Sequence, residues 1–460
     1  MCGRIAMRKK QEEWSGRIGF ILSTMGSAIG LGSIWKFPYE VGSNGGGAFV
    51  SCYLLGLVLI VFPLMLVEFT IGRRGRSDAV GSIALVAGQS AASRHWQLLG
   101  AVGIVTSFLI LSFYSVIGGW ALSYAVDTVR SGLPGDSASA VQARFDVLLA
   151  SPWSMAGYHA LFMTLTALIV ARGIAGGIER ACKVLMPILI VLVVVLALYS
   201  MAEGDVAAAS RFLFGFDREV VSAKIALEAL GLGFFSIGVG LAVMITYASY
   251  AGPDIDLRQI AIATIVGDTL VSCLAGLAVF PIVFVEKLDP ASGPGLMFVT
   301  LPLAFARLPF GAPVATAFFV LLAVAGLASA ISMLEMPVAF LQRRTPCSRR
   351  FATVTSALVC WALGLFSVLS FNLWADWFPL ASVPGLARAS VFDLLDQLTS
   401  NMLLPAGSFA LALFGGWVIP ASLFAEELRF GPTAIAVIRV LLRYIVPCAI
   451  AAASLAPLRY

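Results

Sequence analysis

The chain has 460 residues, of which 60% are hydrophobic and only 12% are charged. A water-soluble protein of this length needs far more polar surface, so the composition excludes an ordinary soluble domain and indicates that lipid is the main solvent. The formal net charge of +5 does not require a nucleic-acid partner, because the basic residues gather in loops, as in many membrane proteins.

Eleven apolar segments are each long enough to cross a bilayer as a helix, which takes about 20 residues. Together they predict an all-α polytopic membrane protein with one transmembrane domain over residues 1–460. Residues 1–17 are polar and basic and lack the apolar core of a removable signal peptide. The expected segments are 18–40, 46–72, 97–127, 154–171, 183–201, 222–250, 259–285, 312–341, 351–371, 391–418 and 435–456.

The basic residues indicate on which side each connection lies. If the N-terminus is cytoplasmic, most Lys and Arg fall in cytoplasmic connections, for example Arg73 with Arg74 and Arg343 with Arg344. An excess of Lys and Arg in cytoplasmic loops is the usual rule. We therefore predict a multi-pass protein whose residues 1–17 form a cytoplasmic N-terminal segment.

The connection 287–311 is expected to be extracellular and is rich in proline and glycine. Loops of this length are uncommon unless they have a function. The connection also contains the apolar patch Leu296-Met297-Phe298, which a solvated linker would leave exposed. We predict that it folds back onto the protein.

Two apolar segments are interrupted by glycine and serine. The first contains Gly26, Gly30 and Gly32, and the sixth contains the stretch 235–240. Glycine inside a helix costs about 1 kcal/mol relative to alanine, although such glycines also serve tight helix packing.

These two segments open two successive groups of five, over 18–201 and 222–418, with 435–456 as an eleventh helix. Paired interruptions in corresponding positions indicate a binding site near the bilayer midplane between inverted repeats. Unwound carbonyls there would suit a cation, and the N-termini of half-helices would suit an anion.

Several longer stretches then resemble the neurotransmitter:sodium symporter family, whose fold is LeuT-like, over nearly the whole chain. An eleven-helix chain is similar to the family's shorter prokaryotic branch. The resemblance implies a bacterial inner-membrane protein that imports an amino acid or amine with Na⁺ by alternating access, with no organic cofactor. The matching stretches are 14–22, 26–39, 44–49, 63–68, 173–180, 244–250 and 329–332.

The resemblance implies one or two Na⁺ sites. In the first, Ser33 replaces the family's usual Asn, and Asp268 adds a formal negative charge. A carboxylate inside the membrane is costly, which favours a functional role, and hard cations prefer oxygen ligands. The ligands implied for this site are Ala28, Ser33, Ser236 and Asp268.

The second implied Na⁺ site has lost one usual ligand. Ala328 stands where the family has Thr or Ser, and a methyl group cannot coordinate an ion. We expect this site to be weak, so that the number of coupled ions stays open. Its implied ligands are the carbonyls of Gly26, Ile29 and Ala325 and the hydroxyl of Ser329.

Chloride-dependent members carry a Gln on the sixth helix, and Leu232 stands at that position here. With a carboxylate at Asp268 and without the Gln, the resemblance implies independence from chloride. Ser272 and Tyr53 nevertheless match chloride ligands.

The implied substrate pocket is apolar and has room at Gly238. No acidic residue replaces Gly30, as it does in monoamine carriers, and Tyr114 matches the family's carboxylate-binding tyrosine. We therefore predict a zwitterionic amino acid with an apolar side chain. The implied pocket residues are Ser27, Ala28, Gly30, Leu31, Gly32, Ile110, Tyr114, Phe235, Ser236, Gly238, Leu241, Ser329 and Met333.

The family closes its path with an outer and an inner gate. The outer pair here would be Lys36 with Asp396, looser than the usual Arg pair because lysine lacks bidentate geometry. The usual inner ion pair cannot form, because Gln11 and Arg343 occupy its positions.

Trp14 and Tyr250 are then expected to plug the inner path, with Glu12 or Glu13 reaching Arg343. Without the usual pair, we expect the inward-open state to be more populated than in members that have it.

Other classes fit less well. Two histidines without a nucleophile–base constellation argue against an enzyme, and polar residues clustered at one midplane site argue against a channel. The main alternative is a sensor or regulator with the same fold that is transport-incompetent or differently coupled. It is favoured because both implied Na⁺ sites lack a ligand that the family usually has. The expected partners are an amino acid as the small-molecule substrate and the lipid bilayer. No nucleic acid is expected, and the protein is expected to be a monomer or weak dimer.

Overall fold

A computed structural model describes residues 12–135, 137–290, 295–383 and 386–455, and the regular structure throughout these ranges is helical. Nine helical spans there are long and apolar enough to cross a membrane, and one bent pair, Arg17–Ala28 with Gly32–Ser43, would make a tenth. The predicted all-α polytopic fold is confirmed. The predicted count of eleven stays a prediction, because segment 222–250 is divided between two shorter helices.

The first half of the chain forms ten α-helices, with wider π-helical turns over Gly32–Lys36, Leu57–Val61 and Ile174–Glu179. Short helices α5, α7 and α10 lie in connections where no element was expected. The helices are α1 Arg17–Ala28, α2 Phe37–Ser43, α3 Gly47–Gly56, α4 Phe62–Gly75, α5 Ala79–Gln89, α6 Gln97–Ser131, α7 Ala138–Ala150, α8 Pro152–Val170, α9 Arg180–Glu203 and α10 Val206–Phe214.

The second half forms eleven α-helices, and π-helical turns over Leu296–Thr300, Gln397–Leu403, Phe414–Val418 and Leu441–Ile445 join several of them. The helices are α11 Ala223–Ile237, α12 Val243–Ser249, α13 Leu257–Val285, α14 Leu301–Arg307, α15 Gly311–Arg344, α16 Arg349–Leu369, α17 Val391–Asp396, α18 Leu404–Leu413, α19 Ala421–Leu428, α20 Pro432–Val440 and α21 Val446–Leu455.

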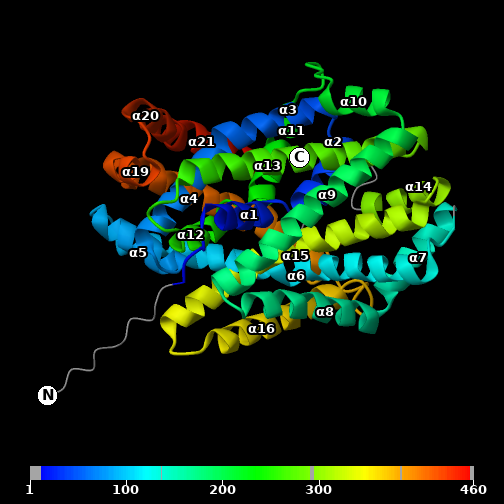
Figure 1. The fold of residues 1–460 in the computed structure, drawn as a ribbon, viewed down its shortest axis with the longest axis horizontal. Coiled ribbons are helices and arrows are strands. Elements are labelled where there is room, and N and C mark those ends of the chain that lie inside the picture. Colours follow the sequence, from blue (N-terminus) through cyan, green and yellow to red (C-terminus); the bar gives the residue numbers. More distant parts are fainter. Residues whose placement is uncertain (1–11, 136, 291–294, 384–385, 456–460) are drawn as a thin grey trace.

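The long helices run across the molecule, and several of the short helices lie toward its two ends (Figure 1). Helices α5, α12 and α19 lie toward one end, and α7 and α14 toward the other. The chain enters at the first of these ends, where Trp14 packs against α12. We call this end the N-terminal side.

The first predicted interruption is a real break in the helix. Helix α1 ends at Ala28, Ile29 leaves the helical region with ψ 87°, and the chain turns helical again at Gly32. The two pieces are bent by 50°. The break frees backbone groups near the centre of the span, as the glycine pattern predicted.

The second interruption separates α11 from α12. Gly238 and Gly240 adopt positive φ angles of 72° and 89°, which glycine reaches without a steric penalty. A methyl group at Gly240 would lie only 2.5 Å from Ser408 Oγ, so the position also needs a hydrogen. The fully buried Glu68 carboxylate accepts the amides of Gly240 (2.8 Å) and Met244 (3.2 Å), which satisfies groups that the break leaves unpaired.

The connection 287–311 contains more regular structure than the expected loop. Residues 291–294 lie outside the described residues, but Leu296–Thr300 is helical and continues into α14. The apolar patch is buried rather than exposed. Phe298, for example, contacts the Trp120 ring at 5.7 Å and the Tyr124 ring at 5.4 Å. Burial of this patch against α6 fixes the segment over the membrane helices.

Candidate functional site

The break in the first span faces a cavity in the middle of the molecule, with about 440 Å³ of unfilled space that includes some open to solvent. Of the predicted pocket residues, all but Leu31 line it. Three further residues were missed: Val243, Ser332 and Leu404. The position of Ser332 one turn after Ser329 was a usable signal, whereas nothing in the sequence marked the other two.

One end of the cavity presents polar groups. The Leu31 amide donates a hydrogen bond to the Tyr114 hydroxyl (3.1 Å), so Leu31 takes part through its backbone. A methyl group at Gly30 would collide with Ser329 Oγ and with the Tyr114 hydroxyl, and one at Gly32 would lie 3.0 Å from Ser236 Cα. Glycine is therefore required at both positions, and the bare backbone remains open to the cavity.

The opposite walls of the cavity are apolar, and Ile110, Leu241 and Met333 contribute to them. All three are buried. The cavity lining holds no Asp, Glu, Lys, Arg or His among the described residues. The arrangement suits a ligand with one strongly polar end and one apolar end.

A compact cluster of oxygens lies beside the cavity. Ser33 Oγ donates to Asp268 Oδ1 at 2.5 Å, Ser236 Oγ donates to the same oxygen at 3.0 Å, and the two serine hydroxyls are 3.0 Å apart. Tyr53, which the resemblance linked to chloride, donates its hydroxyl to Asp268 Oδ2 at 2.8 Å. The serines and the aspartate were predicted ion ligands, and the structure brings their side chains together.

Ser33 and Asp268 are fully buried, and Ser236 is only 4% exposed. In the described residues no Lys or Arg lies within ion-pair distance of Asp268. A buried carboxylate without a cation is costly. The oxygen-only surroundings therefore suit a hard cation such as Na⁺.

The residues of the second predicted ion site meet where α1 crosses α15. Ser329 Oγ lies 3.3 Å from the Gly26 carbonyl oxygen and 3.1 Å from that of Ser27. The Ala328 methyl lies 3.6 Å from where a methyl on Gly26 would be. Ile29 and Ala325, predicted to offer carbonyls, are buried on the same two spans. Ala328 thus brings an inert methyl to a site otherwise rich in oxygen.

Trp14 and the segment after α12 close the N-terminal side. The Trp14 indole donates to the Tyr247 carbonyl (2.8 Å), and its backbone amide donates to the Tyr250 carbonyl (3.1 Å). The indole also stacks on Phe20 with ring centroids 5.5 Å apart. Trp14 is 6% exposed and Tyr250 is 8% exposed. The two predicted plugging residues therefore contact each other.

The ionic contacts on this side differ from those expected. Glu13 pairs with Arg76 (3.0 Å), and Glu12 lies 3.7 Å from Arg349. The expected contact of either glutamate with Arg343 is wrong, because Arg343 instead donates to the Arg76 carbonyl (3.1 Å). Arg343 is near the end of α15 and exposed, whereas Arg349 begins α16 and points inward.

Arg349 is the centre of this network. Its guanidinium contacts Glu335 Oε2 at 2.5 Å and donates to the Val170 carbonyl at 2.8 Å. Tyr250 donates its hydroxyl to the other Glu335 oxygen at 2.7 Å. Arg349 is 12% exposed and Glu335 is fully buried. Sequence reasoning missed Arg349 because nothing near it in the chain signals contact with residues 12 or 335.

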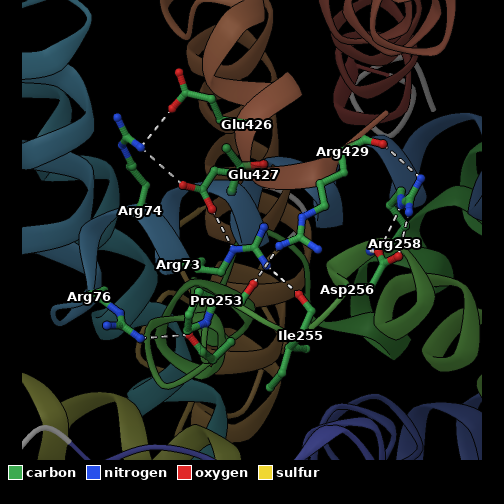
Figure 2. A network of polar contacts seen from close by, with 12 residues as sticks. Arg73, Arg74, Arg76, Pro253, Ile255, Asp256, Arg258, Glu426, Glu427 and Arg429 are labelled. Atoms are coloured by element: carbon green, nitrogen blue, oxygen red, sulfur yellow. Dashed lines mark hydrogen bonds and ion pairs between the residues drawn. The ribbon is translucent and has the colours of Figure 1, made fainter. Parts of the chain in front are cut away.

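A second network on the same side joins α4 to α19 and to the loop after α12, as Figure 2 shows. Arg73 bonds Glu427 (2.6 Å) and the Ile255 carbonyl (2.6 Å). Arg74 pairs with Glu426 at 3.0 Å, and Arg429 donates to the Pro253 carbonyl at 3.0 Å. These contacts connect α19, which lies between the last two membrane spans, to α4, the helix that carries Glu68.

On the opposite side, Arg144 contacts Asp127 and Arg307 pairs with Glu286 (3.2 Å), but the described residues show no such network at the predicted outer gate. Lys36 Nζ lies 4.4 Å from the Phe235 ring centroid. Asp396 accepts a hydrogen bond from Ser400 at 2.7 Å. The predicted ion pair between Lys36 and Asp396 is not formed within the described residues. The two residues belong to different spans, and each has a nearer partner in this conformation.

Two broken helices around a buried cavity, with an oxygen cluster beside it and separate closures at either end, define a membrane carrier. The comparisons identify the family. The model of the sodium:neurotransmitter symporter family matches residues 11–148 and 152–448, so the chain belongs to this family.

Similar curated proteins and a solved structure agree. An uncharacterized sodium-dependent transporter of Bacillus subtilis (strain 168), YhdH, is 38% identical over 96% of both chains. One of Haemophilus influenzae is 32% identical over 89% of this chain and 90% of its own. The crystal structure of MhsT in complex with L-phenylalanine superposes with a TM-score of 0.88 at 40% identity, covering 96% of this chain and 99% of that one. The protein is a multi-pass, sodium-dependent transporter.

Proposed function

We propose that the protein imports an apolar, zwitterionic amino acid together with Na⁺ by alternating access, without chloride. The observation that carries this proposal is the position of Ser236. It lines the cavity and also bonds the carboxylate of Asp268. A substrate in the cavity and an ion at Asp268 would therefore share one side chain, which is the physical basis for coupled binding.

The polar end of the cavity would hold the substrate's carboxylate. The Tyr114 hydroxyl accepts from the Leu31 amide, so its own proton is available to donate to a carboxylate oxygen. The open backbone at Gly30 and Gly32 would contribute further polar groups. The apolar walls disfavour a charged side chain because its desolvation would not be compensated. The L-phenylalanine complex of MhsT supports an apolar substrate.

The Asp268 cluster would hold a sodium ion. Na⁺ beside a buried carboxylate removes an unpaired charge without a chloride ion, which supports chloride independence. Tyr53 already bonds Asp268, so its hydroxyl is engaged. The Ser329 site would hold a second, weaker ion, which makes the proposed number of Na⁺ ions one or two.

We also propose the remaining assignments that rest on the sequence. The repeats are 18–201 and 222–418, the N-terminal side is cytoplasmic in a bacterial inner membrane, and the protein acts as a monomer or weak dimer. Lys36 and Asp396 would close the outer side when substrate is bound, and Trp14 with Tyr250 would close the inner side.

Uptake into proteoliposomes tests the proposal. Labelled L-phenylalanine should accumulate under an inward Na⁺ gradient and equally well when gluconate replaces chloride. Tyr114→Phe should weaken the apparent affinity about tenfold to a hundredfold, since a hydrogen bond to a charged group contributes about 1.5–3 kcal/mol. Tyr158→Phe, outside the cavity, is the matched control.

The ion site has its own variants. Asp268→Asn should abolish Na⁺-driven uptake, whereas Asp146→Asn on the exposed face of α7 should not. Ala328→Ser restores a hydroxyl and should lower the Na⁺ concentration for half-maximal uptake. Uptake that requires chloride, or that persists in Asp268→Asn, would contradict the ion assignment.

The alternative function is a sensor or regulator that binds an amino acid without transporting it. Ala328 favours it, because the second ion site lacks a hydroxyl that the family usually has. Under this alternative, L-phenylalanine would raise the melting temperature of the purified protein, but proteoliposomes would show no accumulation under any Na⁺ gradient.

A further inference from the structure

The last helical span carries two arginines that the transport site does not use. Arg439 lies in α20, and Arg443 lies one turn later in Leu441–Ile445. In the described part of the chain no hydrogen bond or ion pair reaches the Arg439 side chain, and its Nε is buried without a partner. Arg443 Nε donates to the Gly416 carbonyl at 2.7 Å. Neither arginine has an acidic partner among those residues.

The surface around the two arginines is apolar and exposed. Val437 is 54% exposed, Val440 is 52% and Ile445 is 46%. They belong to a span apolar enough to cross the membrane, so lipid covers them. Two uncompensated cations on such a surface are costly, and like charges four residues apart also repel each other. An anion supplied from the membrane would relieve both costs.

Two aromatic residues indicate the depth of this surface in the membrane. Trp417 is 56% exposed and Tyr444 is 53% exposed, and their rings meet edge to face with centroids 6.0 Å apart. Trp417 is one residue from the end of the span Val391–Val418. Exposed Trp and Tyr concentrate at the level of the lipid headgroups. Arg443 lies beside Trp417, and Arg439 is one turn nearer the start of the last span, so both are within reach of that level.

The packing of the last two spans fixes one arginine in place. A methyl group at Gly416 would lie 3.0 Å from Arg443 Cγ, so glycine allows the two spans to approach closely. The Arg443 guanidinium then lies 5.1 Å from the Trp417 ring centre. Its Nε is used by the Gly416 carbonyl, which leaves the two terminal nitrogens to face an incoming anion. A guanidinium held in this way is ordered before it binds phosphate, which lowers the entropic cost.

We propose that Arg439 and Arg443, beside Trp417, bind the phosphate headgroup of an anionic phospholipid in the leaflet on the N-terminal side. Guanidinium groups match the geometry of phosphate oxygens through paired hydrogen bonds. The acyl chains would cover the exposed valines and Ile445. The lipid would contact both of the last two membrane spans, next to α19. In α19, Glu427 pairs with Arg73 and Glu426 pairs with Arg74.

Native mass spectrometry of the full chain tests this site. The purified protein is titrated in detergent with dioleoylphosphatidylglycerol or with dioleoylphosphatidylcholine, and bound lipid is counted. The wild type should retain one phosphatidylglycerol at concentrations where phosphatidylcholine is lost. Arg439→Gln with Arg443→Gln should weaken retention of phosphatidylglycerol by about tenfold or more, given the usual contribution of each basic residue near an anionic headgroup.

Two further variants separate a site from general charge and from misfolding. Arg344→Gln with Arg350→Gln removes the same charge from exposed positions on the same side and should bind phosphatidylglycerol like the wild type. Arg439→Lys with Arg443→Lys keeps both charges but loses the paired hydrogen bonds, so it should retain phosphatidylglycerol less well than the wild type and better than the double glutamine variant. The proposal is overturned if the wild type retains both lipids equally or if the double glutamine variant matches the wild type.

Discussion

The N-terminal side of the cavity and the opposite side are held by contacts of different kinds. On the N-terminal side, the Glu335–Arg349 pair and Trp14 are buried and bonded to several partners. At the predicted gate on the opposite side, Lys36 lies over the Phe235 ring, and among the described residues the Asp396 carboxylate accepts a hydrogen bond from the neighbouring Ser400. Buried pairs that lose one member cost several kcal/mol, whereas exposed pairs contribute about 0–1 kcal/mol.

This difference indicates which side contributes more to the free-energy cost of changing between the inward-open and outward-open states. On the N-terminal side, the buried pair of Glu335 and Arg349 holds the closing residues in place, so opening that side must break this network. Substrate and ion binding would have to offset this cost by differential affinity for the open state. On the opposite side, the predicted gate residues Lys36 and Asp396 can move apart or together without breaking a buried ion pair. Substitutions that remove one contact at a time measure how far the two sides differ in stability.

The largest effect is expected from Arg349→Ala. It leaves the fully buried Glu335 without its cation, and breaking a buried pair in this way costs about 3–5 kcal/mol. The melting temperature in detergent should fall, and a cysteine placed at Ser249 should be labelled faster than in the parent protein. The native cysteines are corrected for by labelling the same variant without the new cysteine.

Arg350→Ala, at the exposed neighbouring position, is the matched control for Arg349→Ala. The double variant Arg349→Gln with Glu335→Gln removes both charges and should recover part of the lost stability, because no unpaired buried charge remains. Equal labelling of Arg349→Ala and Arg350→Ala would show that the pair does not hold this side closed.

The next effect in size is expected from Trp14→Phe. Phenylalanine keeps a ring against Phe20 but loses the indole hydrogen bond to the Tyr247 carbonyl. The Tyr247 carbonyl still accepts the Tyr250 amide (3.2 Å), so the variant loses one hydrogen bond, which contributes about 0.5–1.5 kcal/mol. Labelling at Ser249 should rise, but less than in Arg349→Ala. Trp153→Phe is the control, because Trp153 is 88% exposed, and a rise of the same size there would rule out a specific role for Trp14.

The sequence was sufficient to predict the broken spans and the cavity, and the reason is physical. Glycine is needed where the backbone turns or where a side chain would collide. The spacing of the glycines therefore predicts where the spans break, and these glycines are Gly30, Gly32, Gly238 and Gly240. The rarity of a carboxylate inside an apolar segment marked Asp268 as functional. Its grouping with Ser33 and Ser236 was implied by the family resemblance, because these residues lie in three different segments.

The contacts of Arg349 could not be predicted in the same way. Residues 12, 335 and 349 come together only because α16 folds back beside the N-terminal segment, and an arginine at a membrane interface is common in any loop. The family resemblance directed the prediction to Arg343 instead, because Arg343 occupies the position at which the family usually has an aspartate. The expectation of a more populated inward-open state stays a prediction, and the buried Arg349 network argues for the opposite outcome.

A smaller effect is expected from Glu12→Gln. Glu12 is 42% exposed and its oxygen is 3.7 Å from Arg349, so the charge contributes about 0.2–1 kcal/mol at most. Glutamine can still accept the hydrogen bond from the Ile174 amide. Labelling at Ser249 should rise slightly at low salt, and the difference from the parent should shrink at high salt because screening weakens exposed pairs. A large effect that is independent of salt would contradict the assignment of Glu12 as a weak, screened partner of Arg349.

The smallest effect on stability is expected from Asp396→Asn. Asparagine can accept the same hydrogen bond from Ser400, and no ion pair is lost in this conformation, so the free energy of unfolding should change by less than about 0.5 kcal/mol. If Lys36 reaches Asp396 only when the outer side closes over substrate, the variant should slow uptake while its melting temperature stays at that of the parent. Asp376→Asn, at an exposed position after α16, is the control. Because the melting temperature reports the described conformation and uptake reports the whole cycle, a fall in both would place the ion pair in the resting state and remove the contrast between the two sides.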